Sequence, residues 1–209
     1  MTDVFAEGLC STLLADVGAR TMRAAIKPLR PGWLLRGRAL TVAVPAGDNL
    51  AIHAALALAR PGDVLVIDGQ GYADRALMGG IMCAQALATG IAGVVIDGAM
   101  RDAAELRAGG LPVFAAALSP AGPHKAGGGR VNHPIQCGGV TVAPGDWILG
   151  DDDGVVVFGA AESAALVAAA QAKGGLEARR MAAIARGELR PAWLDAALAG
   201  AEIDIAPAG

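Results

Sequence analysis

The 209-residue sequence is poor in aromatic residues and has no cluster of lysine and arginine. Phe, Trp and Tyr make up 3% of the chain, so platforms that stack nucleic-acid bases are not expected. The formal net charge is −3 and the basic residues are spread along the chain, whereas binding a phosphate backbone needs concentrated positive charge. We therefore expect no nucleic-acid partner.

Cysteine motifs and long apolar runs are also absent. Cys10, Cys83 and Cys137 are far apart and form no C-x-x-C pair, so neither a zinc site nor a disulfide framework is indicated. We interpret them as small buried hydrophobic side chains. The first residues lack the basic-then-apolar pattern of a signal peptide, and no apolar run is long enough to span a membrane. We expect a cytoplasmic protein with no membrane partner.

The chain is rich in apolar residues and in glycine. Hydrophobic residues make up 54% of the sequence, charged residues make up 18%, and 30 residues are glycine. This composition is typical of a compact globular domain with a sizeable core and many tight turns. Because no internal repeat or second domain is visible, we expect one domain over residues 1–209, with a C-terminal helical tail over about 161–209.

Strands and helices alternate in the first half and short strands follow, which predicts a mixed α/β fold. Apolar runs rich in β-branched residues indicate strands, and helical periodicity indicates helices. The strands are expected at 39–44, 64–68, 93–96, 113–116, 135–137, 140–142, 147–149 and 155–158. The helices are expected at 9–17, 48–59, 81–88, 103–108, 162–186 and 189–198. Loops are expected at 27–38, 70–75 and 119–130.

The stretch from Gly93 to Asp102 holds the densest candidate chemistry. Its first residues predict a buried strand, Asp97-Gly98 predicts the end of that strand, and Arg101 and Asp102 follow before the next helix. A guanidinium beside a carboxylate can hold an anionic substrate and a hard cation together. Asp102 and Glu105 are also spaced like a capping box, so capping of the helix is the alternative role of Asp102.

A second candidate element is Gly79-Gly80, at the start of the helix predicted over 81–88. The backbone N–H groups of Ile81 and Met82 lack helical acceptors there, glycine lets a ligand approach, and the helix dipole favours an anion. An ordinary strand-to-helix turn is the alternative. If the two strands are neighbours, this helix start and the Arg101-Asp102 pair open on one edge of the sheet, where ligands of α/β folds bind. The combination suits a 2-oxo acid, with a divalent ion near Asp102 as Lewis acid.

Other polar residues are weaker candidates. Asp48 is a good N-cap for its helix, and His53 inside that helix is interpreted as a packed or half-exposed side chain. The run Asp151-Asp152-Asp153-Gly154 predicts a surface turn in preference to a cation site. The loop predicted at 119–130 is long enough to be functional, and it contains His124, Lys125 and Arg130.

Taken together, these motifs resemble a known family. The run GGIMCAQALATG followed by GVVIDGAMRDAAEL is similar to the RraA-like family, as are LCST, DNLAIH and PGDVLV earlier in the chain. That family includes the class II 4-hydroxy-4-methyl-2-oxoglutarate/4-carboxy-4-hydroxy-2-oxoadipate aldolases and the regulator of ribonuclease E activity A. The resemblance spans most of the chain, and its most specific part is G-x-x-R-D with the helix start upstream of it.

The resemblance implies a swivelling β/β/α fold with a central α-β-β-α arrangement. It also implies homotrimers or hexamers with sites at subunit interfaces. In the site, it implies that Arg101 binds substrate, that Asp102 helps to hold Mg²⁺ or Mn²⁺, and that the amides of Ile81 and Met82 bind pyruvate. One position departs from the aldolases, which have an acidic residue where this chain has Gly80.

We therefore predict a divalent-metal-dependent pyruvate aldolase that cleaves a small 4-hydroxy-2-oxo acid and can decarboxylate oxaloacetate. The predicted catalytic residues are Arg101, which stabilises enolate charge, and Asp102, the metal ligand. The predicted substrate-binding residues are Gly79, Gly80, Ile81, Met82 and Arg101. The general base is not assigned. The alternative is a non-enzymatic regulator that binds a ribonuclease or helicase, and a Schiff-base mechanism would need a lysine such as Lys125.

Overall fold

The computed structural model describes residues 4–5 and 8–203. By its internal contacts the chain divides into two units, Met1–Gln171 and Ala172–Gly209. The expectation of one domain with a helical tail stays a prediction.

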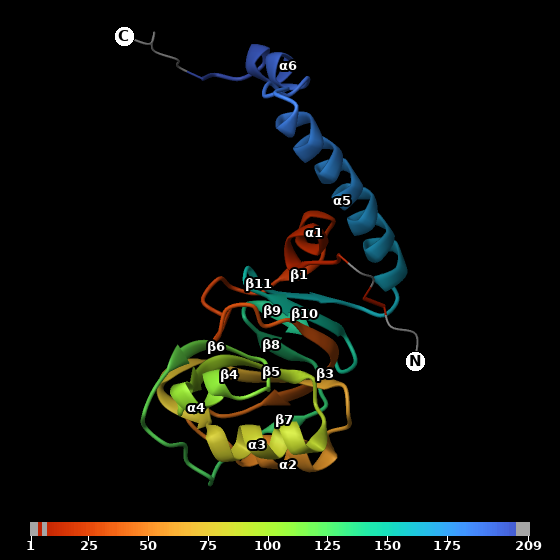
Figure 1. Ribbon diagram of the computed structural model, residues 1–209. Coiled ribbons are helices and arrows are strands. Elements are labelled where there is room, and N and C mark those ends of the chain that lie inside the picture. Colours follow the sequence, from red (N-terminus) through yellow and green to blue (C-terminus); the bar gives the residue numbers. More distant parts are fainter. Residues whose placement is uncertain (1–3, 6–7, 204–209) are drawn as a thin grey trace, which may run out of the picture. The chain divides into compact units, whose positions relative to one another are not determined.

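The first unit is built on a mixed sheet that has nine strands among the described residues (Figure 1). The strand order is β1-β11-β10-β3-β4-β5-β6-β2, and β7 pairs with β3. The strands are β1 (Arg20–Thr21), β2 (Lys27–Pro28), β3 (Leu35–Ala43), β4 (Asp63–Met78), β5 (Gly93–Met100), β6 (Val113–Leu118), β7 (Arg130–Val131), β10 (Trp147–Asp151) and β11 (Gly154–Phe158). A separate pair is formed by β8 (Ile135–Cys137) and β9 (Val140–Val142).

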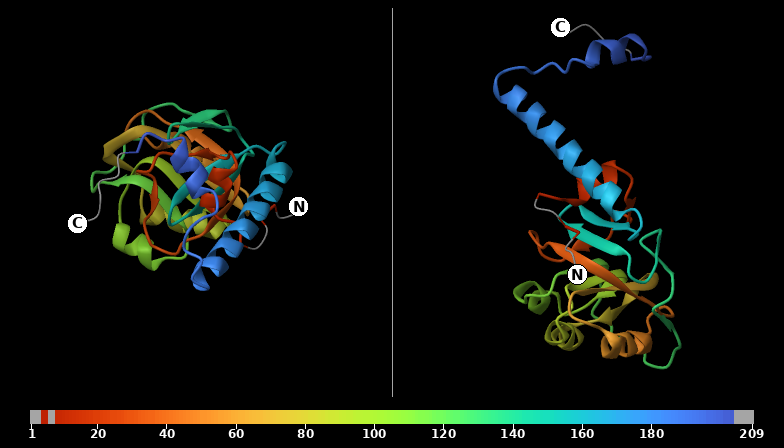
Figure 2. Two further views of the ribbon diagram at one scale, coloured as in Figure 1. Left: turned by 90° about the horizontal axis from the view of Figure 1, so that it is seen from above. Right: turned by 90° about the vertical axis from the view of Figure 1, so that its right-hand side faces the viewer.

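Helices follow the central strands in chain order. Strands β3, β4, β5 and β6 pair in parallel, while β10, β11, β1, β2 and β7 add antiparallel pairs. The helices are α1 (Ser11–Asp16), α2 (Leu50–Leu58), α3 (Gly80–Thr89), α4 (Ala103–Ala108), α5 (Ser163–Ala185) and α6 (Leu194–Ala199). In Figure 1 and Figure 2, α2, α3 and α4 lie together on one side of the parallel strands. The mixed α/β fold predicted from the sequence is confirmed.

The central strands are buried on both faces, which explains their nearly continuous apolar sequences. Successive side chains of β4 alternate between two cores: Leu65 and Ile67 pack with α2 and α3, whereas Val64 and Val66 pack on the opposite face. All eight residues of β5 are buried. Because parallel strands end at the same edge, the residues that follow β3, β4, β5 and β6 are brought together.

Two predicted strand ends are wrong, and the structure gives the reason. Strand β4 continues through the predicted loop at 70–75, because Gln70 and Gly71 adopt positive φ angles and the pairing with β5 shifts register instead of ending. Strand β5 likewise continues through Asp97-Gly98 to Met100. The Asp97 carboxylate is buried there because it pairs with Arg23 at 3.2 Å and accepts the Gly138 N–H at 2.9 Å.

Two further boundaries differ from the sequence prediction. The segment 27–38, predicted as a loop, contains β2 and the first residues of β3. Both gain ladder partners far away in sequence, β6 for β2 and β10 for β3. The turn predicted at Asp151-Asp152-Asp153-Gly154 is confirmed as the β10–β11 hairpin, in which Asp151 lies opposite Gly154.

The second unit contains the C-terminal part of α5 and the short helix α6. Arg180 donates hydrogen bonds to the carbonyl oxygens of Glu188 and Leu189, which fixes the turn after α5. Arg190 forms an ion pair with Asp195 at the start of α6. Across the described ranges, no helix has both the length and the apolar character needed to cross a bilayer.

Candidate active site

A cavity of about 120 Å³ opens at the carboxyl edge of the parallel strands. Each of the four parallel strands is followed by a segment that contributes to its wall. The lining residues are Asn49 and His53 after β3, Leu77, Met78, Gly79, Ile81 and Met82 at and after the end of β4, Arg101 after β5, and Pro123 and Lys125 after β6. Pockets for drug-sized ligands have volumes of about 300–1,000 Å³. This cavity is smaller, so its volume suits a small acid.

The start of α3 forms one wall of the cavity, as the sequence predicted. Gly79 is the N-cap and Gly80 is the first helical residue. The Gly80 N–H donates to Asp102 Oδ2 at 2.9 Å. The N–H groups of Ile81 and Met82 have no helical acceptors, because they lie in the first turn of the helix. A side chain at Gly79 would collide with Asp102 Oδ2 and would place its Cβ 2.8 Å from Arg101 Cγ. Glycine is therefore required at position 79 by the close approach of the Arg101-Asp102 loop.

Asp102 does not cap its own helix, so the capping alternative is wrong. It occupies the N-cap position of α4 with φ of 60°, and its side chain makes no capping hydrogen bond there. This left-handed backbone directs the carboxylate to the start of α3 instead. The guanidinium of Arg101 lies beside it, with Nε 3.6 Å from Asp102 Oδ2. The structure thus brings together the two elements that the sequence singled out separately.

Glu105 lies beside the start of α3, although it does not line the cavity, and the sequence did not single it out as a site residue. A Cβ at Gly80 would lie 2.5 Å from both carboxylate oxygens of Glu105, so the Glu105 carboxylate fills the space that a side chain at Gly80 would take. Gly80 is not among the residues with positive φ, so its backbone does not require glycine. The signal in the sequence was the missing side chain at Gly80 combined with a carboxylate one helical turn after Asp102.

Both carboxylates act electrostatically on Cys83, one turn into α3. The pKa of the Cys83 thiol is raised to about 12. Burial is the largest cause, and the negative charges of Asp102 and Glu105 contribute to the same shift. The thiol is therefore protonated and unreactive at neutral pH.

The opposite wall of the cavity belongs to α2. Asn49 is 2% exposed, and its Nδ2 donates to the Leu77 carbonyl at 3.0 Å and to Met82 Sδ at 3.2 Å. Among the described residues, the Asn49 Oδ1 and the His53 Nε2 are buried and have no hydrogen-bond partner. His53 lies one turn after Asn49, and both residues line the cavity. The sequence predicted only a packed or half-exposed histidine at this position.

Asp48 holds the loop that carries Lys125 against the start of α2. Asn49 and not Asp48 is the N-cap of α2, so the predicted N-cap is one residue too early, although Asp48 Oδ1 still accepts the Leu50 N–H at 2.9 Å. The Asp48 Oδ2 accepts the N–H groups of Ala126 and Gly127 at 2.8 and 2.7 Å. These backbone donors, with Leu50 first, lower the pKa of Asp48 against the opposing effect of burial. Lys125 is thereby placed in the cavity wall.

The donor set near the start of α3 fits a hydrated divalent cation. No cluster of three or more His, Cys, Asp or Glu side chains able to hold a metal occurs in the part of the chain that the structure describes. Asp102 and Glu105 offer two carboxylates, and the room at Gly80 lets both approach the helix start. Mg²⁺ retains several waters and accepts substrate oxygens, so one or two carboxylates are compatible with such an ion.

These features define a mixed α/β protein whose helix start, Arg-Asp pair and small cavity share one edge of a parallel sheet. The model of the RraA-like family, described as Aldolase/RraA, matches residues 5–157, and the chain belongs to this family.

The names of similar proteins include aldolases and an inhibitor of RNA processing. A protein of Halalkalibacterium halodurans named "Putative 4-hydroxy-4-methyl-2-oxoglutarate aldolase" is 43% identical over 150 residues, which cover 71% of each chain. A protein of Burkholderia multivorans with the same name is 40% identical over 155 residues, covering 71% of this chain and 92% of the relative. The solved structure of the RNA-processing inhibitor RraA from Thermus thermophilis is 33% identical, with a TM-score of 0.66, over 72% of this chain and 92% of that one.

Proposed function

We propose that this protein is a divalent-metal-dependent pyruvate aldolase that cleaves 4-hydroxy-4-methyl-2-oxoglutarate or a related 4-hydroxy-2-oxo acid. The observation that carries the proposal is the cavity that joins the start of α3 to Arg101, with Asp102 hydrogen-bonded to the same helix start. The names of the aldolase relatives support it. Homotrimeric or hexameric assembly and a cytoplasmic location stay predictions of the family resemblance.

The protein groups divide the binding of a 2-oxo acid among them. The N–H groups of Ile81 and Met82 donate hydrogen bonds to the carboxylate at the positive end of the α3 dipole. The Arg101 guanidinium donates to the keto oxygen and stabilises the negative charge that develops there as the carbon–carbon bond breaks. Asp102 and Glu105 would hold Mg²⁺ or Mn²⁺. When bound, that ion supplies Lewis-acid polarisation of the keto group.

Cleavage then follows from charge stabilisation. The C3–C4 bond breaks, its electron pair forms the enolate of pyruvate, and the C4 hydroxyl becomes a carbonyl as it loses its proton. Decarboxylation of oxaloacetate leaves the same enolate, with carbon dioxide in place of the second carbonyl product. A site that stabilises this enolate therefore supports both reactions.

The proposal is tested with purified protein and two substrates. We expect pyruvate release from oxaloacetate and from 4-hydroxy-4-methyl-2-oxoglutarate in the presence of Mg²⁺ or Mn²⁺, measured by a coupled lactate dehydrogenase assay. A chelator should stop the release, and added Mn²⁺ should restore it. No metal-dependent pyruvate release from either substrate at micromolar enzyme would contradict the proposal.

A second candidate is a regulator that binds a ribonuclease or helicase. It is favoured by the likeness to a structure described as an inhibitor of RNA processing. A regulator of this type needs an exposed protein-binding surface and no turnover. Direct binding to a purified ribonuclease, together with no metal-dependent pyruvate release, would favour this function over the aldolase.

A further inference from the structure

We propose that His53 is the general base of the cleavage reaction, with Nε2 as the atom that takes the proton of the substrate's C4 hydroxyl. This inference rests on the proposed aldolase function and adds the one catalytic group that function lacks. It comes from the α2 wall of the cavity, which faces the helix start and Arg101.

The first observation is that two buried polar atoms of this wall lack partners. The Asn49 Oδ1 and the His53 Nε2 have no hydrogen bond with any described residue, whereas buried polar atoms are normally paired. Asn49 cannot turn away from the cavity, because its Nδ2 is held by the Leu77 carbonyl and by Met82 Sδ. Both residues line the cavity, so each carries an unpaired polar atom close to any ligand that fills it.

The second observation concerns which substrate group can satisfy these atoms. A 4-hydroxy-2-oxo acid has a carboxylate and a keto oxygen at one end, and both are acceptors that need Arg101 and the amides of Ile81 and Met82. Its C4 hydroxyl is a donor at the other end. With the acid end on the start of α3, the hydroxyl reaches the α2 wall, where both unpaired acceptors lie.

Of the cavity's side chains, only the imidazole is suited to take the proton. An amide oxygen such as Asn49 Oδ1 accepts a hydrogen bond but is far too weak a base, so Asn49 is a positioning residue. The Lys125 ammonium offers donors and no acceptor. An imidazole can change its protonation state near neutral pH, which suits proton transfer.

The step balances without any further reactant. His53 Nε2 bonds to the hydroxyl proton, and the O–H electron pair forms the new C4 carbonyl. The C3–C4 pair forms the C2–C3 double bond, and the C2–O π pair moves to the keto oxygen to give the enolate. The proton on His53 passes to water, and the enolate takes one proton from water to become pyruvate. Decarboxylation of oxaloacetate has no hydroxyl proton to remove, so it does not use His53.

This difference between the two reactions supplies the test. In His53→Gln, the side-chain amide retains polar contacts near Nε2 but is not basic. We expect kcat for cleavage of 4-hydroxy-4-methyl-2-oxoglutarate to fall at least about 100-fold, the usual contribution of a general base. The kcat for oxaloacetate decarboxylation should stay within about threefold by the same argument. In His53→Ala, added imidazole should restore part of the cleavage activity and leave decarboxylation unchanged.

The matched control is His133→Gln, which changes an exposed histidine outside the cavity and should affect neither reaction. Cleavage that survives in His53→Gln would overturn the assignment of the base. Equal loss of both reactions would also overturn it, because His53 would then hold the site together without acting on the hydroxyl. A parent protein with neither activity would instead reject the aldolase function itself, whatever the variant does.

Discussion

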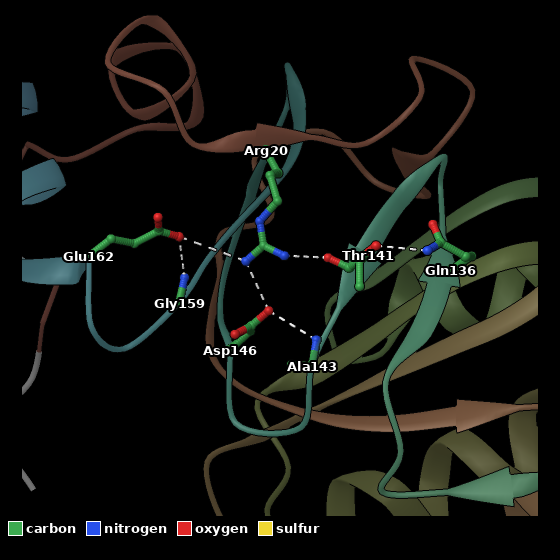
Figure 3. A network of polar contacts seen from close by, with 7 residues as sticks. All are labelled: Arg20, Gln136, Thr141, Ala143, Asp146, Gly159 and Glu162. Atoms are coloured by element: carbon green, nitrogen blue, oxygen red, sulfur yellow. Dashed lines mark hydrogen bonds and ion pairs between the residues drawn. The ribbon is translucent and has the colours of Figure 1, made fainter.

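Two clusters in the first unit contain the same charged groups and differ in how well those groups are paired. In the first, shown in Figure 3, Arg20 donates to the Thr141 carbonyl and to Asp146 Oδ2 at 3.0 Å, and lies 3.8 Å from Glu162. The carboxylates have further partners, since Asp146 accepts the Ala143 N–H and Glu162 accepts the Gly159 N–H. This cluster joins three parts of the chain, and each of its charged groups has a partner within the protein.

The second cluster consists of Arg101, Asp102 and Glu105. Its one ion pair among the described residues joins Arg101 to Asp102 at 3.6 Å, and the Glu105 carboxylate has no partner there. The Asp102 side chain is 42% exposed, against 11% for Asp146. Charges that are satisfied by the protein hold the fold, whereas charges left unsatisfied beside a cavity are available to a ligand. The predictions below test whether the two clusters divide stability and activity in this way.

The largest effect is expected for Asp102→Asn. Asparagine tolerates the left-handed backbone at this position and can still accept the Gly80 N–H, so the change removes only the charge. Metal-dependent pyruvate release should fall at least about 1,000-fold, since a catalytic cation contributes several kcal/mol. The melting temperature should move by less than about 2 °C for a change of this kind at an exposed site. Activity within a few-fold of the parent would show that the Asp102 charge has no part in catalysis.

The next effect is expected for Arg101→Lys. Lysine keeps the positive charge but loses the planar pair of donors. We expect kcat/KM for oxaloacetate to fall about 100-fold, the typical cost of losing one donor to a developing oxyanion. If steady-state kinetics show unchanged kcat and KM, the keto oxygen is bound elsewhere in the cavity.

Glu105→Gln should weaken Mn²⁺ binding about 10-fold, the lower range for groups that support a metal site. Electron paramagnetic resonance measures free Mn²⁺ directly and needs no substrate. Gly80→Asp alone should displace the exposed Glu105 carboxylate from the start of α3, because its Cβ would lie 2.5 Å from that group. In Gly80→Asp with Glu105→Ala, the carboxylate returns to the helix start, and Mn²⁺ affinity should recover. Mn²⁺ affinity that is the same in all variants would remove Glu105 from the site.

The cluster around Arg20 should show the opposite pattern, in which a substitution lowers stability and leaves activity unchanged. Asp146→Asn removes the charge that Arg20 binds at 3.0 Å and that is mostly buried. The loss should be about 1 kcal/mol, equivalent to about 2–4 °C in melting temperature for a chain of this size. Calorimetry measures this, and kcat should be unchanged. A fall in kcat without a loss of stability would contradict the division between the clusters.

The smallest effect concerns Asp68, whose carboxyl is only partly paired. Burial raises its pKa, with the negative charge of Asp97 as a lesser cause, and the Gln70 N–H opposes the shift. Since the folded protein binds this proton more tightly than the unfolded chain does, the Asp68 charge lowers stability at neutral pH. That penalty fades as the pH falls through the raised pKa.

Asp68→Asn should therefore raise the melting temperature at pH 7 by less than about 4 °C, which corresponds to about 1 kcal/mol. The difference from the parent should vanish in acid, where Asp68 is protonated. Asparagine can still accept the Gln70 N–H, so the comparison isolates the charge. A difference that persists unchanged in acid would assign the effect to packing.

The sequence predicted those parts of the site that depend on local features. The start of α3 follows from two glycines before a helical pattern, and Arg101-Asp102 follows from its place after an apolar run. The lengths of β4 and β5 could not be read in this way. Their polar middle sections pair with each other across bulges, and the Asp97 charge is offset by Arg23, which is distant in sequence.

Glu105 and His53 show the same limit within the site. Glu105 is a helix-surface carboxylate until the packing of α4 against α3 places it beside Gly80. His53 is a lone histidine in a helix until α2 packs beside the start of α3, which makes it a cavity-lining residue with an unpaired Nε2. Such information is in the tertiary arrangement of three helices, and no spacing along the chain encodes it.

The left-handed backbone of Asp102 also limits how this position can change over time. Most side chains are strained at φ of 60°, whereas asparagine, aspartate and glycine are tolerated. A single-base change in an aspartate codon gives asparagine. Under the proposed function, a gene encoding this fold can thus lose catalysis in one step while the product still folds. A lineage of RraA-like proteins therefore has a short route from enzyme to non-catalytic binding protein, and position 102 is where that divergence is expected to appear.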